Sequence, residues 1–366
     1  MSQWRYFNPV DVRFGPDVLG QVSKAIGDRN WILVTHPDAP MMPYREKLMA
    51  GSKPPLIVVD TIEPNPSLAM LDALCQRLAP VAEQIELVVA LGGGSVMDSA
   101  KFLAAGHGQY APVAAYLEGQ GALDEAALPI IAIPTTAGTG SELTKWATIW
   151  DPAQGRKLSL NSDDLYAEAA FIDPLITASL PWSITLASGL DALSHALESL
   201  WNIHANPLTR AYAVAASKDV LIALPQLHAN LSNMTAREVL ARGAMRAGLA
   251  FSNTMTALAH NISYPITLDY GVPHGLACSF CLPEVMVAAM GLDADCDAAL
   301  SQIFGDLSGA PAQLRGWLNA LDVAAEPRDY GLSDDAWQQI IEDAFAGPRG
   351  RNFLGRAQQF PAATIR

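Results

Sequence analysis

The sequence predicts an α/β domain over residues 1–181, followed by an all-α domain over residues 182–366. In the first part, short apolar segments alternate with helical segments, which is typical of a parallel sheet covered by helices. From about Pro181 onward the sequence is rich in Ala and Leu, follows the helical period and loses strand-like alternation. A chain of 366 residues is also too long for one small domain.

The expected elements can be given in chain order. We expect strands at Trp31–His36 and Pro55–Asp60, and a helix within Ser67–Gln84. Glu86–Ser95 and Pro129–Ser141 are each expected to be a strand that runs into a glycine- or threonine-rich turn. Short extra strands are expected at Trp146–Trp150, Lys157–Asn161 and Ala169–Asp173, and helices within Ser179–Trp201, Leu208–Leu227 and Thr235–Tyr264.

Composition excludes several classes of protein. The chain has 37 acidic and 23 basic residues, a net charge of -14 and no dense basic run, so we expect no nucleic-acid partner. No apolar run reaches the roughly 18 residues of a membrane span, and Met1–Gly15 lacks the apolar core of a signal peptide. Four cysteines are too few for a disulfide scaffold, so we expect a reducing, cytoplasmic location. We assign the lone C-x-x-C pair, Cys278 and Cys281, to core packing.

Two turns that follow expected strands have the residues of a nucleotide site. In "ALGGGSVMDSAK", Gly92, Gly93 and Gly94 let the backbone pass close to a ligand, and the helix that follows offers its first N–H groups to a phosphate, although three glycines also suit a plain tight turn. In "IPTTAGTGSE", hydroxyl donors are supplied by Thr135, Thr136, Thr139 and Ser141. Because the carboxyl ends of parallel strands meet at one edge of a sheet, the two turns together predict a nucleotide site that suits a ligand with two phosphates, such as a nicotinamide dinucleotide.

A second group of residues has metal-binding chemistry. Asp191 and His195 are four residues apart in a helical pattern and therefore share a helix face. His260 and His274 add two imidazoles, and one carboxylate with three imidazoles suits Fe(II) or Zn(II). Spacing alone leaves a second interpretation open, in which these residues are ion-paired or core histidines.

The chain resembles the iron-containing (group III) alcohol dehydrogenase family over nearly its full length. The matching motifs are "FG" at 14–15, "PNP" at 64–66, "GGGSVMD" at 92–98, "IPTTAGTGSE" at 133–142, "DP" at 173–174, "GLDALSHALE" at 189–198, His260 and "PHG" at 273–275. The resemblance implies a dehydroquinate-synthase-like fold with an interdomain active site, a homodimer, and Asp191, His195, His260 and His274 as ligands of Fe2+ or Zn2+. It also implies NAD(P)H contacts from both turns and from three further positions. These contacts are Gly93, Gly94 and Ser95, Thr135, Thr136 and Thr139, and Asp98, Lys157 and Leu180.

Two positions depart from the pattern of many family members. At the end of the expected strand "WILVTH", His36 stands where many members have an aspartate that binds the adenosine ribose, and Asp38 follows two residues later. The choice between NAD and NADP therefore stays open, with NADPH expected to be accepted. Four residues after His260, Tyr264 replaces a second histidine, and we expect it to relay a proton or shape the pocket.

The sequence is also similar to the phosphonate-metabolism branch of this family, whose members reduce phosphonoacetaldehyde to 2-hydroxyethylphosphonate. The similarity rests on "HNISYP", "YGVPHGLACSFCLPE" and "GPRGRNFLGRA". A phosphonate needs fixed cations, for which the candidates are Lys145, Arg349, Arg351 and Arg356. The alternative is that these cations form a solvated surface patch.

The predicted reaction is hydride transfer from the nicotinamide to an aldehyde carbonyl that the metal polarises. Two alternative interpretations are also enzymes: a general short-chain alcohol or diol dehydrogenase, and a dehydroquinate-synthase-like lyase. A non-catalytic binding protein is a further alternative, which the complete set of four ligands and two cofactor turns argues against.

Overall fold

The computed structural model of the chain describes residues 3–37, 39–123 and 125–361, so Asp38 lies outside the described residues. The chain divides into two compact units. Unit 2 contains Asn8–Thr136 and Ser141–Ser179. Unit 1 contains the chain from Leu180 onward, the short segment Ala137–Gly140, and the N-terminal residues up to Phe7.

Unit 2 is built around a six-stranded sheet in the order β1-β8-β5-β4-β2-β3, and all of its strand pairs are parallel. Its strands are β1 (Asp11–Phe14), β2 (Trp31–Thr35), β3 (Ile57–Val59), β4 (Leu87–Gly92), β5 (Ile130–Pro134) and β8 (Ala169–Ile172). An antiparallel hairpin, β6 (Trp146–Asp151) with β7 (Arg156–Asn161), forms a separate two-stranded sheet.

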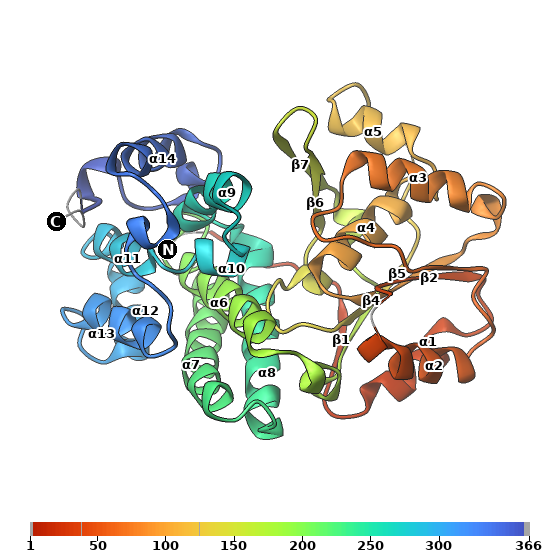
Figure 1. Cartoon of the computed structure of the whole chain (residues 1–366), viewed down its shortest axis with the longest axis horizontal. Coiled ribbons are helices and arrows are strands. Elements are labelled where there is room, and N and C mark those ends of the chain that lie inside the picture. The colour runs from red at the N-terminus through yellow and green to blue at the C-terminus, as the bar shows by residue number, and fades with distance from the viewer. Residues whose placement is uncertain (1–2, 38, 124, 362–366) are drawn as a thin grey trace. The chain divides into compact units, whose positions relative to one another are not determined.

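The central strands are buried on both faces because helices cover both sides of the sheet. Every residue of β2, β4 and β5 is buried. Trp31, Leu33 and Val89 pack against α1 and α2, which lie on one face, whereas α3 and α4 lie on the other (Figure 1). The helices of this unit are α1 (Val22–Ile26), α2 (Met42–Ala50), α3 (Leu68–Leu78), α4 (Gly94–Ala105) and α5 (Ala111–Leu117). Burial on both faces explains why these strands are continuous apolar runs in the sequence.

Unit 1 has nine α-helices from Trp182 onward in the described part of the chain. They are α6 (Trp182–Glu198), α7 (Pro207–Ala229), α8 (Met234–Thr254), α9 (Leu258–Tyr270), α10 (His274–Ala277), α11 (Leu282–Ala289), α12 (Ala294–Phe304), α13 (Ala310–Asn319) and α14 (Asp334–Ala346). The long helices α6, α7 and α8 pack together (Figure 1). The predicted succession of a parallel α/β fold and a helical fold is thus confirmed. Among the described helices, none combines the length and apolar character that a membrane crossing requires.

One strand of the main sheet has no signal of its own in the sequence. β1 has the sequence DVRF, carries two charged side chains and is nowhere fully buried. It exists because its backbone pairs with β8, from Asp11 opposite Ala169 to Phe14 opposite Ile172. Such an edge strand depends on a partner that lies far along the chain, so its local sequence is a poor guide.

Candidate metal centre and nucleotide turns

The four predicted metal ligands come together in unit 1 from three helices. The long helix α6 presents Asp191 and His195 one turn apart, α9 presents His260 in its first turn, and α10 begins with His274. All three imidazoles face the same carboxylate oxygen. Asp191 Oδ1 lies 3.4 Å from Nε2 of His260, 3.7 Å from Nε2 of His195 and 3.8 Å from Nε2 of His274.

These distances fit a shared metal ion better than direct ion pairs. Two ligand atoms each about 2.1 Å from one ion in tetrahedral geometry are separated by roughly 3.4 Å. Moreover, His260 Nε2 is buried and has no hydrogen-bond partner among the described residues. A buried ring nitrogen without a partner, 3.4 Å from a buried carboxylate, is the arrangement expected where a cation bridges them.

The site is closed on one side and open on the other. Asp191, His195 and His260 are almost fully buried, whereas the side chain of His274 is 41% exposed. Phe251 covers the His195 ring in parallel, with the ring centroids 3.9 Å apart. A substrate oxygen would therefore approach from the side of His274.

Burial and charge move the pKa values of the ligands in different directions. Burial lowers the pKa of His195 to about 4, which keeps this imidazole neutral and able to bind a metal. Burial alone would lower the pKa of His260, but the Glu198 and Asp191 carboxylates outweigh it and raise this pKa to about 10. Burial would likewise raise the pKa of Asp191, but the three facing imidazoles hold it well below its usual range.

Sequence reasoning missed Glu198, which is completely buried behind the site. Glu198 Oε2 accepts a hydrogen bond from His260 Nδ1 at 2.6 Å. The spacing contains a signal that could have found it, because Glu198 follows Asp191 by seven residues and His195 by three on the same helix. Its contact with His260, 62 positions away, is a tertiary contact that spacing does not reveal.

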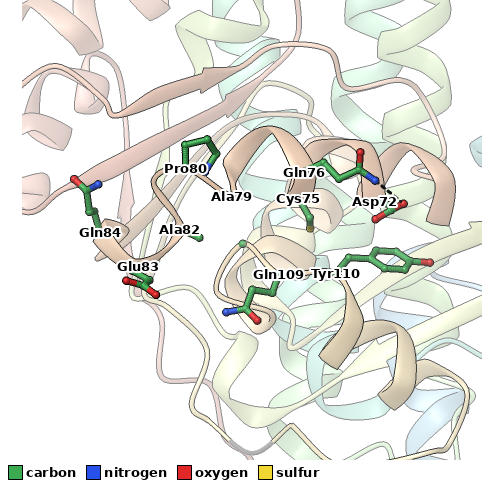
Figure 2. Close-up of a pocket in the computed structure, with 11 residues that line it drawn as sticks. Asp72, Cys75, Gln76, Ala79, Pro80, Ala82, Glu83, Gln84, Gln109 and Tyr110 are labelled. Atoms are coloured by element: carbon green, nitrogen blue, oxygen red, sulfur yellow. Dashed lines mark hydrogen bonds between the residues drawn. The ribbon is translucent and has the colours of Figure 1, made fainter.

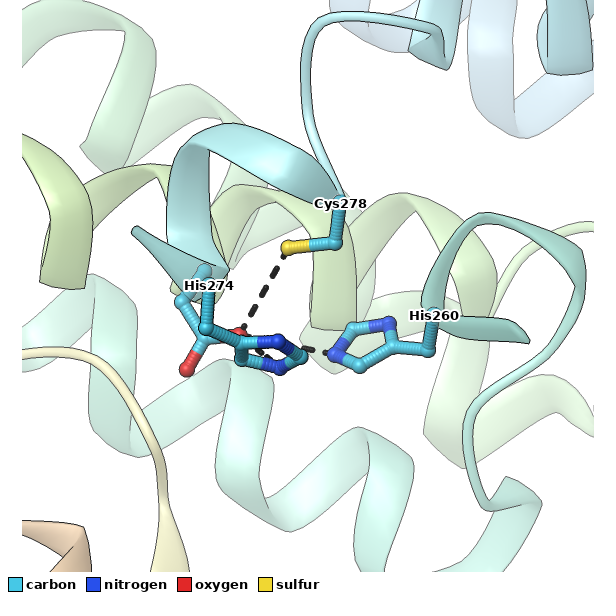
Figure 3. Close-up of side chains that lie close together, drawn as sticks. His260, His274 and Cys278 are labelled. Carbon is cyan, nitrogen blue, oxygen red and sulfur yellow. Dashed lines mark hydrogen bonds and ion pairs between the residues drawn. The ribbon is translucent and has the colours of Figure 1, made fainter. Parts of the chain in front are cut away.

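Cys278 is a second residue whose place the sequence did not indicate. Its thiol lies 3.8 Å from Asp191 Oδ1, and ligand atoms of Asp191, His260, His274 and Cys278 all lie within 4.8 Å of one another. Figure 3 shows the labelled His260, His274 and Cys278 side chains converging on one point. Cys278 is buried, as core packing requires, but it also forms part of the wall of the candidate metal site.

Tyr264, the predicted proton relay, lies one turn after His260 on α9 and is half-buried. Its ring is parallel to that of His274 within 5°, with the centroids 6.3 Å apart. The tyrosine is therefore close to the most exposed of the four ligands, where a substrate would enter.

In unit 2, the glycine turn and the threonine turn lie side by side. Thr135 donates its backbone N–H to the carbonyl oxygen of Gly92 at 3.1 Å. A Cβ atom on Gly93 would lie 3.3 Å from Thr136 Oγ1, so a side chain there would crowd the second turn. Helix α4 begins at Gly94, and none of the described side chains caps it. The first N–H groups of this helix are thus available to an anion.

Asp98 and Ser95 fix the surroundings of these turns. Ser141 Oγ and the backbone N–H of Thr148 donate to the two carboxylate oxygens of Asp98 at 2.9 and 3.1 Å. Burial raises the pKa of Asp98. Ser95 Oγ accepts a hydrogen bond from the backbone of Asn65, in the "PNP" motif, at 3.1 Å. Both side chains therefore brace the loops around the start of α4.

The other predicted cofactor contacts are distributed over both units. His36 is half-buried just after β2, and Lys157 lies on β7, so both belong to unit 2. Thr139 and Leu180 belong to unit 1, where the Leu180 carbonyl accepts a hydrogen bond from Arg237 at 3.0 Å. His36 lies beside the glycine turn, because the residue before it, Thr35, pairs with Leu91 in the sheet.

The predicted phosphonate-binding cations belong to both units. Lys145 is in unit 2 and pairs with Asp163 at 2.5 Å. Arg349, Arg351 and Arg356 are in unit 1, on the segment after α14, where Arg349 is half-buried and the other two are exposed. This segment is anchored beside α9, the helix that carries His260, because Asn352 Nδ2 donates to Thr256 O at 2.9 Å, just before that helix. Asn261, next to His260, donates to Ala344 O at 2.6 Å at the end of α14.

A hollow of about 640 Å³ on unit 2 contains none of the predicted site residues (Figure 2). Its lining comes from α3, the segment after it and the turn after α4. The lining residues are Asp72, Cys75, Gln76, Ala79, Pro80, Ala82, Glu83, Gln84, Gly108, Gln109 and Tyr110. It has neither a cluster of metal ligands nor a cation for an anionic substrate, so we do not assign the reaction to it.

Comparison with known proteins agrees with this geometry. A family model described as iron-containing alcohol dehydrogenase matches residues 9–174, and a model of the C-terminal part of the Fe-containing alcohol dehydrogenase family matches residues 185–354. Sulfoacetaldehyde reductase of Bilophila wadsworthia is 31% identical over 284 residues, which are 74% of this chain and 73% of that protein. Phosphonoacetaldehyde reductase of Streptomyces viridochromogenes is 31% identical over 325 residues, which are 84% of this chain and 81% of that protein.

The fold is shared with solved structures as well. The crystal structure of sulfoacetaldehyde reductase from Bifidobacterium kashiwanohense in complex with NAD+ has a TM-score of 0.88 and 28% identity, and the match covers 98% of this chain and 97% of that chain. The motifs, the fold and the family matches over both parts of the sequence lead to one conclusion. The chain belongs to the iron-containing alcohol dehydrogenase family and is an NAD-linked oxidoreductase that interconverts an aldehyde and an alcohol.

Proposed function

We propose that this enzyme reduces phosphonoacetaldehyde to 2-hydroxyethylphosphonate, using a metal ion held by Asp191, His195, His260 and His274. The observation that carries the metal-dependent reaction is the convergence of three imidazoles on one buried carboxylate oxygen. When bound, Fe2+ or Zn2+ would supply Lewis acidity toward an aldehyde oxygen, and the nicotinamide cofactor would supply the hydride.

The residues of the chain have distinct tasks in this proposal. Gly93, Gly94 and Ser95 bind the cofactor pyrophosphate at the start of α4, and Thr135, Thr136 and Thr139 donate hydroxyl hydrogen bonds to the cofactor. Asp98 holds the loops that carry these donors. Lys157 and Leu180 are additional cofactor contacts. The Tyr264 hydroxyl delivers a proton to the oxygen of the reduced carbonyl.

Arg349 and Arg351 are the proposed partners of the phosphonate group. Their support is positional. Asn352, in the same segment, donates to Thr256 O just before α9, and Asn261 on α9 donates to Ala344 O near the end of α14, the helix that leads into the segment. A guanidinium offers several N–H donors in a plane and suits the oxygens of such an anion. Lys145 is a weaker candidate since Asp163 already neutralises it.

Sulfoacetaldehyde is a second candidate substrate. It is favoured by two similar proteins, one from Bilophila wadsworthia and one from Bifidobacterium kashiwanohense, which are both sulfoacetaldehyde reductases. The two substrates share a two-carbon aldehyde and an anionic head group. They differ in the charge of that group, which is larger for a fully ionised phosphonate.

The decisive experiment compares three aldehydes of similar size with the Fe2+-loaded protein. NADH and NADPH oxidation is followed with phosphonoacetaldehyde, sulfoacetaldehyde and neutral propionaldehyde. We expect kcat/KM for phosphonoacetaldehyde to exceed that for propionaldehyde about a hundredfold, which corresponds to about 2.7 kcal/mol of differential transition-state binding. Equal values for the three aldehydes would instead identify a general short-chain alcohol dehydrogenase.

Variants then locate the anion site. Arg349→Gln and Arg351→Gln should lower kcat/KM for the phosphonate and leave the neutral aldehyde unaffected. Arg328→Gln is the matched control, because Arg328 is an exposed arginine of the same unit that faces Asp334. If the protein consumed no NADH with any aldehyde, a lyase that merely retains the cofactor would become the better interpretation.

A further inference from the structure

We propose that Glu198 is the positioning residue of the metal site, and that its carboxylate sets the affinity for the metal by fixing both the backbone and the ring of His260. This inference rests on the proposed metal-dependent function. It goes beyond that function because Glu198 is not one of the four ligands, and its side chain contacts the start of α9.

Glu198 makes four hydrogen bonds to one short stretch of chain. Its Oε2 accepts from the backbone N–H of Ala257 at 2.8 Å and from His260 Nδ1 at 2.6 Å. Its Oε1 accepts from the backbone N–H groups of Ala259 and His260 at 2.5 and 3.3 Å. The side chain has no solvent exposure, so water does not compete with these donors.

Three of these contacts replace a missing cap on α9. Its N-cap residue is Ala257, whose methyl side chain cannot accept a hydrogen bond, so the first N–H groups of this helix need partners from elsewhere. Glu198 supplies them from the end of α6, and a negative charge at a helix N-terminus is also favoured by the helix dipole. The backbone that carries His260 is thereby tied to the helix that carries Asp191 and His195.

The fourth contact selects the nitrogen of His260 that faces the metal site. A carboxylate has acceptors only, so the hydrogen of the 2.6 Å contact belongs to Nδ1 of the imidazole. Nε2 is left to bind a metal, and it is the nitrogen that lies 3.4 Å from Asp191 Oδ1. A carboxylate behind a metal-binding histidine fixes the ring orientation and increases the basicity of the ligand.

A purely structural role, as a helix cap, makes a different prediction from a positioning role. Loss of a cap lowers the stability of the protein with and without metal. Loss of positioning lowers the affinity for the metal itself. The test therefore measures metal binding directly and does not depend on turnover.

The experiment titrates metal-free protein with Zn2+ and with Co2+ against a chromophoric chelator, for the wild type, Glu198→Gln and Asp219→Asn. Asp219 is the matched control, because it is another buried carboxylate of unit 1 and its partners are Arg242 and Arg246 instead of a metal ligand. We expect Glu198→Gln to lower the affinity for both Zn2+ and Co2+ about 10- to 100-fold. Asp219→Asn should stay within about twofold of the wild type, and the visible spectrum of bound Co2+ should change in Glu198→Gln alone.

Two outcomes overturn the inference. One is a Glu198→Gln variant whose affinity for both metals is within about threefold of that of the wild type. Glu198 would then act only as a helix cap. The other is an equal loss of affinity in Asp219→Asn, which makes the effect one of general stability. A wild type that binds no metal would instead refute the proposed function, and the positioning role with it.

A second measurement needs no variant and covers the case in which Glu198→Gln fails to fold. NMR spectra of wild-type protein labelled with 15N-histidine and loaded with Zn2+ should show that His260 binds the metal through Nε2 and is protonated at Nδ1. A His260 bound through Nδ1 overturns the proposal.

Discussion

Burial of charge is the dominant feature at the scale of single residues. Asp191 and His260 are each nearly inaccessible to water, yet they face each other across 3.4 Å with no hydrogen bond between them. Isolated buried charges are costly, so this arrangement is stable only when a proton or a metal ion compensates the carboxylates. Protons and metal ions therefore compete for the same nitrogen.

This competition predicts how metal affinity depends on pH. The pKa of His260 is raised to about 10, so below that pH a proton must leave before Nε2 can bind a metal. The apparent affinity should thus rise as the pH rises from 6.5 to 8.5, by up to about tenfold per pH unit for one displaced proton. Zn2+ titration against a chelator, corrected for the protonation of the chelator, measures this slope. A flat profile would contradict the raised pKa of His260.

His36 is the residue for which we predict a change in cofactor choice. It follows β2 at the position where an acidic side chain would contact the ribose hydroxyl groups of NAD and repel the additional phosphate of NADP. His36→Asp should therefore lower kcat/KM with NADPH at least tenfold relative to that with NADH. The ratio of the two initial rates at subsaturating cofactor reports the change. An unaltered ratio would mean that the ribose is bound by a different part of the chain.

At the scale of elements, the metal site depends on how closely α10 approaches α6. Gly275 follows His274 immediately, and a Cβ at this position would overlap the backbone carbonyl oxygen of Ala187 on α6. The helix that carries His274 can therefore contact the helix that carries Asp191 only because residue 275 has no side chain. A backbone atom cannot move aside as a flexible side chain can.

Gly275→Ala should thus separate the two helices and weaken the metal site. We expect a loss of about 1–3 kcal/mol in the free energy of unfolding, as in other overpacked cores, together with weaker Zn2+ binding. Gly316→Ala is the control, because Gly316 lies in α13 with open space around it and alanine is the better helix former. Chemical denaturation and metal titration of both variants test this. A Gly275→Ala protein that matches the wild type in both would contradict the close-contact argument.

The secondary-structure elements also show which features of the fold and the site can be predicted from the sequence. Buried strands such as β2 and β4 were predictable, because burial on both faces requires continuous apolar runs. The four ligands were proposed from spacing and from motifs, and the structure brings them together. Glu198 and Cys278 were missed because their proximity to the site arises from contacts between α6 and later parts of the chain. Periodicity describes the face of one helix and does not identify the residues that pack against it.

At the scale of the whole molecule, all four cysteines are buried and reduced. Burial raises the pKa of Cys75 and Cys296 to about 12 and that of Cys278 and Cys281 well above the usual range. Because the thiolate is the reactive form, the native protein should release almost no chromophore from a disulfide reagent such as DTNB. In guanidinium chloride all four thiols should react. Stoichiometric labelling of the native protein at neutral pH would show that at least one cysteine is accessible.

The two units are not consecutive along the chain, and this has a consequence for biosynthesis. Tyr6 OH donates to the Leu249 carbonyl at 3.2 Å, and the Phe7 N–H donates to Asn253 Oδ1 at 2.9 Å, so this N-terminal segment is completed by α8 of unit 1. The chain then enters unit 2 at Asn8, where β1 cannot pair until β8, its partner strand, has been synthesised. On the ribosome, the earliest residues to emerge are thus among the last to acquire their native neighbours. A stalled or prematurely released chain that ends before α8 leaves them without their partners, even if the parallel sheet has already formed.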